Sequence, residues 1–297
     1  KQKTAYDMTS SLVGSEMCIR DRYCVIYFSS NGLYYPNTEE NFAKFMADDR
    51  FEWRRYHFHK ARREIYVRDI YKQWYIKGIN SEISSIDKLI AWISQNVPKG
   101  CDIITVGNSA GGYMAVLAAC LLGARYAYDF SGQFNIEDAL EGGEDKNSLF
   151  KREFRTSDIS AGRVCNNRDY LDLKKYIYAS PDLDIFYFYP ALCEDDKKQA
   201  EHIADCGNIH PFLFRDDKHG ETMYNFNLDD VFAMEPEQIM ELSRRIQGKI
   251  IGRTAFSLYV RGAAGTFAAL FTQFQKKLFK SCLLYTSPSP RDSTSSR

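Results

Sequence analysis

The residues from Asp102 to Gly112 constrain the fold of this chain more than any other segment, because they read as a buried strand, a sharp turn and a helix start. The run Ile103–Val106 is apolar and rich in β-branched residues, as in a buried strand. Ser109 lies at the apex of the turn, with Gly107 two residues before it and Gly111 two residues after it. Small residues at these positions let strand and helix pack closely around a strained backbone. Ser109 is therefore our candidate nucleophile.

The run Gly107-Asn108-Ser109-Ala110-Gly111 matches the G-x-S-x-G signature of the α/β-hydrolase superfamily in a strand–turn–helix context, and the chain resembles that superfamily here. The resemblance implies an α/β fold, with a mostly parallel sheet and helices on both faces, and acyl chemistry at Ser109. The same short pattern occurs in phosphate-binding turns and ordinary strand–helix corners. The motif alone is therefore not decisive, and the positions of an acid and a histidine after Ser109 become the next criterion.

An acid and a histidine follow Ser109 in the order that the superfamily uses. The acid is expected after the next-to-last strand, where Glu194, Asp195 and Asp196 stand at a helix start. We expect Asp196, with Asp195 as the alternative, although an acidic helix N-terminus explains the cluster equally well. His219, in the loop after the last strand, fits as general base; a solvated surface histidine is the alternative.

Donors for a developing oxyanion are expected at two places. One is the backbone N–H of Ala110, directly after the candidate nucleophile. The other lies in the loop Ser29–Gly32 after the first core strand, where we favour Ser30 over a plain polar turn. His57 and His59 alternate on a predicted strand but have no third ligand with suitable spacing. We therefore predict no metal site, and the proposed chemistry requires no cofactor.

Both ends of the chain resemble translated sequencing adapter. Leu12–Arg22 can be back-translated into a transposase-type adapter, and the reverse complement of that DNA encodes Cys282–Arg291 in another frame. We interpret residues 1–22 and 282–297 as artefact, exclude them from fold reasoning, and expect the native N-terminus to be missing. Residues 23–281 have the length of one α/β domain with a substantial core.

Apolar runs and helical patterns alternate along the interior, which favours a parallel sheet. We expect a hydrolase-like domain at 23–250, with a cap-like insertion or plain surface excursion at 135–183, before the strand that leads to the acid. The predicted strands are Tyr23–Phe28, Trp53–His59, Ile103–Val106, Tyr126–Phe130, Ile185–Tyr189 and Pro211–Phe214, and the predicted helices are Ile83–Gln95, the segment after Ser109 and Lys197–Ala204.

The charges balance, with 39 basic and 39 acidic residues, so nothing indicates a nucleic-acid partner. The interior cysteines show no C-x-x-C spacing, which favours a reducing compartment. We therefore take the cytoplasm as the default location of the protein. No apolar run is long enough for a membrane span. Residues 251–281 read as an amphipathic helical segment whose part 267–280 suits either docking on protein or peripheral contact with a membrane.

The segments Arg68–Tyr75 and Phe130–Gln133 give a narrower resemblance, to bacterial hydrolase-like proteins linked with surface-polysaccharide or glycan pathways. The resemblance implies a small-molecule or glycan acyl substrate. Three functions stay open: a serine esterase that uses Ser109, Asp196 and His219, an acyltransferase with the same triad, or a non-catalytic scaffold. If the structure held these three side chains too far apart to interact, the scaffold would be favoured.

Overall fold

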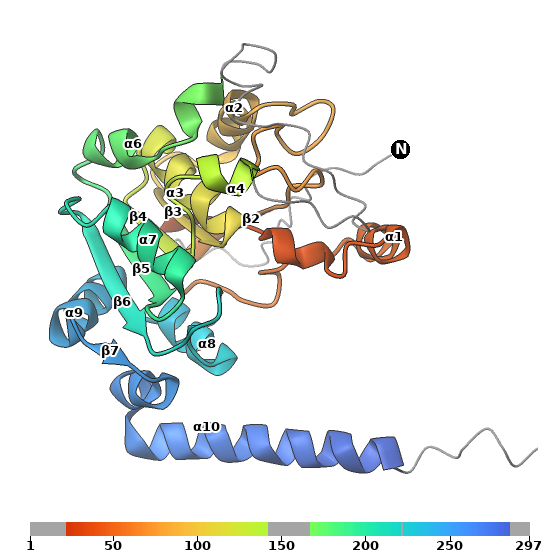
Figure 1. The fold of residues 1–297 in the computed structure, drawn as a ribbon, viewed down its shortest axis with the longest axis vertical. Coiled ribbons are helices and arrows are strands. Elements are labelled where there is room, and N and C mark those ends of the chain that lie inside the picture. Colours follow the sequence, from red (N-terminus) through yellow and green to blue (C-terminus); the bar gives the residue numbers. More distant parts are fainter. Residues whose placement is uncertain (1–21, 142–166, 221, 286–297) are drawn as a thin grey trace, which may run out of the picture.

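The computed structural model describes residues 22–141, 167–220 and 222–285. Within them the strands form one seven-stranded sheet in the order β2-β1-β3-β4-β5-β6-β7, and every neighbouring pair is parallel (Figure 1). The predicted α/β architecture with a parallel sheet is confirmed. The strands are β1 Tyr23–Phe28, β2 Ala61–Val67, β3 Asp102–Asn108, β4 Tyr126–Phe130, β5 Asp184–Pro190, β6 Ile209–Phe214 and β7 Ile250–Ile251.

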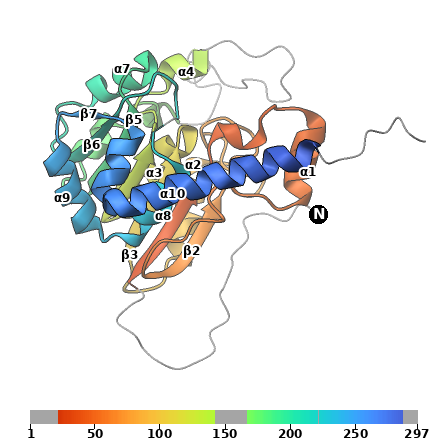
Figure 2. The ribbon, with the colours of Figure 1, turned by 90° about the horizontal axis from the view of Figure 1, so that it is seen from below.

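Helices cover both faces of this sheet (Figures 1 and 2). The first core lies under α2, α3 and α6, and the second lies under α8, α9 and the start of α10. The helices are α1 Glu39–Ala47, α2 Ile86–Asn96, α3 Ala110–Leu122, α4 Glu137–Glu141, α6 Lys174–Tyr178, α7 Glu194–His202, α8 Asn225–Ala233, α9 Pro236–Ile246 and α10 Arg253–Tyr285, with short 3₁₀ helices at Asn31–Tyr34 and Asn167–Tyr170.

Strand β1 is buried along its whole length because both of its faces are covered. Its alternate side chains enter opposite cores: Ile26 and Phe28 join the first, whereas Val25 and Tyr27 join the second. The helix that follows the serine, α3, is almost completely buried between the sheet and its neighbouring helices. A continuous apolar run in a strand or a helix thus marks the centre of the molecule.

The predicted strand Trp53–His59 is wrong. Residues 53–59 form turns and irregular backbone, and the edge strand β2 begins two residues later at Ala61. Aromatic rings misled the prediction, because Trp53 and Phe58 are buried in the second core without joining a ladder. The first half of β2 is charged and only partly buried, as expected of an edge strand, so it lacks an apolar signal.

The proposed cap at 135–183 is described only at its two ends, since residues 142–166 lie outside the described residues. On its C-terminal side, α6 packs on the first core through Ile177, and Tyr113 Oη donates to Tyr170 O at 2.8 Å. The described part on its C-terminal side therefore lies against α3. Whether the insertion covers a substrate stays a proposal.

Candidate active site

The turn between β3 and α3 holds Ser109 in a strained conformation, with a φ of 53° and a ψ of −121°. A Cβ at Gly107 would lie 2.0 Å from Gly111 O, and one at Gly111 would lie 2.2 Å from Phe28 O. Neither position can hold a side chain unless backbone moves. The glycines of the motif are therefore required by close packing between the turn, the helix and β1.

Three side chains that are far apart in the sequence form one hydrogen-bonded chain. The Oγ of Ser109 lies 2.8 Å from His219 Nε2, and His219 Nδ1 lies 2.9 Å from Asp196 Oδ2. Ser109 follows β3, Asp196 lies in the first turn of α7 after β5, and His219 follows β6. All three strands are parallel, so their carboxyl ends meet at one edge of the sheet.

Burial separates the two candidate acids. Asp196 is 1% exposed and points to His219, whereas Asp195 lies on the exposed side of α7. Neighbouring residues on a helix point about 100° apart, so one of them can face the histidine while the other faces water. The structure therefore joins Asp196, not Asp195, to the chain of hydrogen bonds.

Two opposing effects set the pKa of His219. Partial burial lowers it, but the hydrogen bond and the charge of Asp196, with a smaller effect of Asp195, raise the pKa above its usual 6.5. The carboxylate favours the imidazolium form, which a base carries after it takes a proton from serine. The electrostatics of the site therefore suit proton transfer from Ser109 to His219.

The loop that carries His219 is held by α10. Arg253 Nη2 donates to Asp216 Oδ2 at 2.5 Å, and Asp216 O accepts from Leu192 N at 3.1 Å. Burial acts to raise the pKa of Asp216, but the hydrogen bond and charge of Arg253, with backbone bonds from Lys218 and Asp217, lower it below 3.8. A residue from beyond the predicted hydrolase-like domain thus helps to fix the histidine.

The expected oxyanion donors differ in their surroundings. Ala110 is the first residue of α3, where backbone N–H groups have no carbonyl partner within the helix. The N–H of Ser30 instead donates to Glu52 Oε2 at 2.5 Å, and its hydroxyl donates to Glu52 Oε1 at 3.1 Å. The Ser30 amide is therefore already engaged by a carboxyl group.

Glu52 is a residue of the site that the sequence did not point to. Asn108 Nδ2, beside the candidate nucleophile, also donates to Glu52 Oε1, at 3.5 Å. Burial raises the pKa of Glu52 above its usual 4.5, although the bonds from Ser30 and Asn108 partly oppose this. Glu52 thus links the loop after β1 to the residue before Ser109. Glu52 lies in a turn, between Phe51 and Trp53, and belongs to no recognisable motif.

The two segments of the narrower resemblance meet beside the site. Trp74 Nε1 donates to Gln133 Oε1 at 3.1 Å, and Tyr75 Oη donates to Ser29 O at 2.7 Å. Asp69 is buried and accepts three backbone N–H bonds, at 2.7 to 2.9 Å, from residues 71, 73 and 75. This carboxyl therefore organises the loop that braces Ser29.

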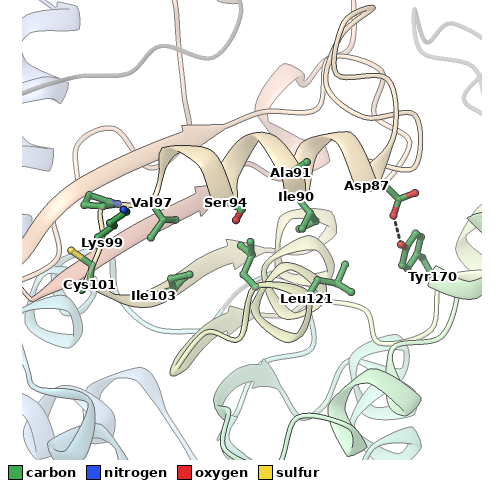
Figure 3. A pocket seen from close by; sticks show the side chains of 13 residues that line it. Asp87, Ile90, Ala91, Ser94, Val97, Lys99, Cys101, Ile103, Leu121 and Tyr170 are labelled. Carbon is green, nitrogen blue, oxygen red and sulfur yellow. Dashed lines mark hydrogen bonds between the residues drawn. The ribbon is translucent and has the colours of Figure 1, made fainter.

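A cavity of about 830 Å³ opens beside Asn108 and is lined largely by polar and charged side chains, among them Ser30, Glu52, Arg54 and Arg55. Figure 3 shows a different cavity, of about 620 Å³, bordered by α2, the end of α3 and the start of β3. Its wall includes Ile103, six residues before Ser109, so it lies roughly 20 Å down the strand. Of these two cavities, the first is the nearer to the candidate nucleophile, because Asn108, the residue before Ser109, lines it.

Three of the other four histidines contact a carboxylate, among them His210, whose Nε2 lies 2.9 Å from Asp184 Oδ1. His57 Nδ1 lies 2.7 Å from Glu64 Oε2, and His202 Nε2 lies 2.9 Å from Asp172 Oδ1. Within the part of the chain that the structure describes, no group of three or more histidine, cysteine or acidic side chains is arranged to hold a metal ion.

No protein-family model matches the chain, and no curated protein matches it. Solved structures do. The capsule O-acetyltransferase of Neisseria meningitidis serogroup A is 14% identical, over 75% of this chain and 88% of that one, with a TM-score of 0.48. Est1E from Butyrivibrio proteoclasticus is 12% identical, over 82% and 98%, with a TM-score of 0.43. Fluorophosphonate-binding serine hydrolase F of Staphylococcus aureus is 12% identical, over 76% and 87%, with a TM-score of 0.44.

Proposed function

We propose that this protein is a serine hydrolase that cleaves an ester or related acyl bond. The observation that carries the proposal is the hydrogen-bonded chain from Ser109 through His219 to Asp196, with distances of 2.8 and 2.9 Å. A scaffold needs no such alignment, since a core can pack without it. The geometry therefore supports an enzyme over a binding module.

The proposed reaction begins when Ser109 Oγ attacks the acyl carbonyl while His219 Nε2 takes its proton. Asp196 stabilises the imidazolium that results. Negative charge develops on the carbonyl oxygen, where Ala110 N–H donates, together with a donor from the Ser30 loop. His219 returns the proton to the leaving group, and water then hydrolyses the acyl-enzyme. No cofactor takes part in these steps.

We further propose that the leaving or acyl group carries hydroxyls or other polar groups, as in a glycan ester. The support is the cavity beside Asn108, which offers guanidinium donors from Arg54 and Arg55 and carboxyl acceptors such as Glu52. A sugar hydroxyl that entered this cavity in place of water would give acyl transfer through the same acyl-enzyme. The insertion at 135–183 is the segment we propose to act as a cap.

A fluorophosphonate probe tests the proposal. It should label the native protein once, and peptide mapping should place the label on Ser109. Ser109→Ala should abolish labelling and ester hydrolysis without a change in the melting temperature. Labelling that persists in Ser109→Ala would indicate another nucleophile, and a folded native protein that is never labelled would support the scaffold.

Product analysis separates hydrolysis from transfer. A soluble acyl ester would be supplied with and without a sugar acceptor, and free acid and acylated sugar would be measured. We expect free acid in both cases. If acylated sugar were the main product, the protein would be an acyltransferase and not a hydrolase.

A further inference from the structure

The long helix α10 has two parts with different surroundings. It divides at Gly262, whose φ of 72° and ψ of 178° interrupt the helix. Before this point Phe256 is buried in the second core and Arg261 Nε donates to Asp230 Oδ2 at 2.5 Å. After it, residues 263–281, here called the distal segment, lie apart from the sheet and its covering helices (Figure 1). The part of α10 before Gly262 is thus fixed to the second core, whereas the distal segment is exposed.

The distal segment carries a row of exposed aromatic side chains. Phe267 is 74% exposed, Phe271 52% and Phe274 58%. Residues at this spacing share one face of a helix, and the rings of Phe267 and Phe271 stack with centroids 6.4 Å apart. Apolar surface of this kind is unfavourable in water, and a contiguous exposed row marks a binding surface. No part of the chain that the structure describes covers this row.

The net positive charge of α10 indicates which kind of partner the exposed aromatic row binds. The sequence from Arg253 to Ser281 contains no aspartate or glutamate, whereas Lys276, Lys277 and Lys280 follow the aromatic row. A second copy of the segment would bring like charges together, which disfavours self-association. An anionic lipid surface offers the opposite charge beside an apolar interior.

We propose that the distal segment binds the surface of an anionic lipid membrane, with Phe267, Phe271 and Phe274 buried at the headgroup boundary and Lys276 near the phosphates. Binding of this type lies in the plane of the interface. It agrees with the finding that, among the described residues, no helix is long and apolar enough to cross a bilayer. The proposal is independent of the catalytic one.

Co-sedimentation of the full chain with lipid vesicles tests this. We expect binding to phosphatidylcholine vesicles that contain phosphatidylserine, much weaker binding to phosphatidylcholine alone, and release at high salt. The Phe271→Ser/Phe274→Ser variant should lower the partition coefficient by about tenfold or more, since it removes apolar area that the membrane buries. A matched control is Tyr178→Ser/Leu192→Ser, because these side chains are 54% and 50% exposed elsewhere on the body. The control should bind as the native chain does.

Lys276→Glu/Lys277→Glu leaves the aromatic row intact and should abolish the preference for phosphatidylserine, so the test holds even if the phenylalanine variant misfolds. Thermal melts would establish that each variant is folded. Three results would overturn the proposal: a native chain that binds neither vesicle, equal loss in the aromatic variant and its control, or a dimer in light scattering that the phenylalanine substitutions dissociate without any vesicle binding.

Discussion

At the scale of single residues, the proposed chemistry depends on which carboxylate faces the histidine. Asp196 does so from a buried position, and Asp195 contributes only a weaker charge from the exposed side of α7. Their difference can be measured, because the two residues are adjacent and chemically identical.

Asp196→Asn should lower kcat/KM for a soluble ester by ~10³–10⁴-fold, since an amide neither fixes the tautomer of His219 nor stabilises its charge. Asp195→Asn should stay within about threefold, because an exposed charge is screened by water and salt. Steady-state kinetics on both proteins would measure this. A large loss in Asp195→Asn with little loss in Asp196→Asn would mean that the alternative acid is the correct one.

The same kinetics predict a pH dependence. His219 acts as a base only when neutral, and its pKa is raised above 6.5 in the native protein. The native rate should therefore rise with pH through a midpoint above 6.5, and Asp196→Asn should move the midpoint of the residual activity downward. A midpoint that does not move would contradict the assigned pairing.

At the scale of elements, the elbow depends on close contact between β3, α3 and β1. Gly107→Ala places a Cβ 2.0 Å from the backbone of Gly111, which cannot rotate away as a side chain would. We expect a loss of about 3 kcal/mol in the free energy of unfolding. Gly207→Ala is the control, because its Cβ meets nothing within 4 Å. Denaturant unfolding of both variants would measure the difference, and equal stabilities would mean that the elbow relaxes freely.

Asp69, which organises the loop that braces Ser29, should make the stability of the protein depend on pH. Burial raises the pKa of Asp69 from 3.8 to about 6, against the opposing bonds from Tyr75, Tyr71 and Gln73. The folded protein thus holds this proton more tightly than the unfolded chain does. The stability due to this group is largest below 3.8 and decreases until the pH passes about 6.

Asp69→Asn should remove this decrease, because an amide does not titrate. The difference in unfolding free energy between the native protein and the variant should change by roughly 3 kcal/mol across that pH range. Denaturant unfolding at a series of pH values measures it. Parallel curves for the two proteins would show that Asp69 stays ionised throughout.

At the scale of the whole molecule, residues 23–281 should be sufficient for the fold. Among the contacts of Arg22, the last residue to be trimmed at this end, are an exposed ion pair, in which its Nε lies 2.8 Å from Asp102 Oδ2, and two backbone hydrogen bonds, with Lys60 O and Asp102 N. An exposed pair contributes little, so the melting temperature should fall by no more than about 3 °C. Calorimetry of the full and trimmed chains would test this. A trimmed protein that melts many degrees lower would show that the adapter interpretation removed genuine structure.

The sequence by itself determined what depends on neighbouring residues. Gly107, Ser109 and Gly111 specify a strand, turn and helix locally, since their spacing reflects backbone geometry. Apolar runs such as Tyr23–Phe28 and Tyr126–Phe130 predicted central strands to the residue, because both faces of a parallel sheet must be buried.

Tertiary structure alone decided what depends on distant partners. The edge strand β2 is stabilised by pairing with β1 and not by an apolar pattern, so its position could not be read locally. The choice of Asp196 over Asp195 depends on the rotation of α7 against the sheet, and Glu52 reaches Ser30 only because their loops fold together. Such contacts join residues far apart in the chain, and no local preference encodes which pairs will meet.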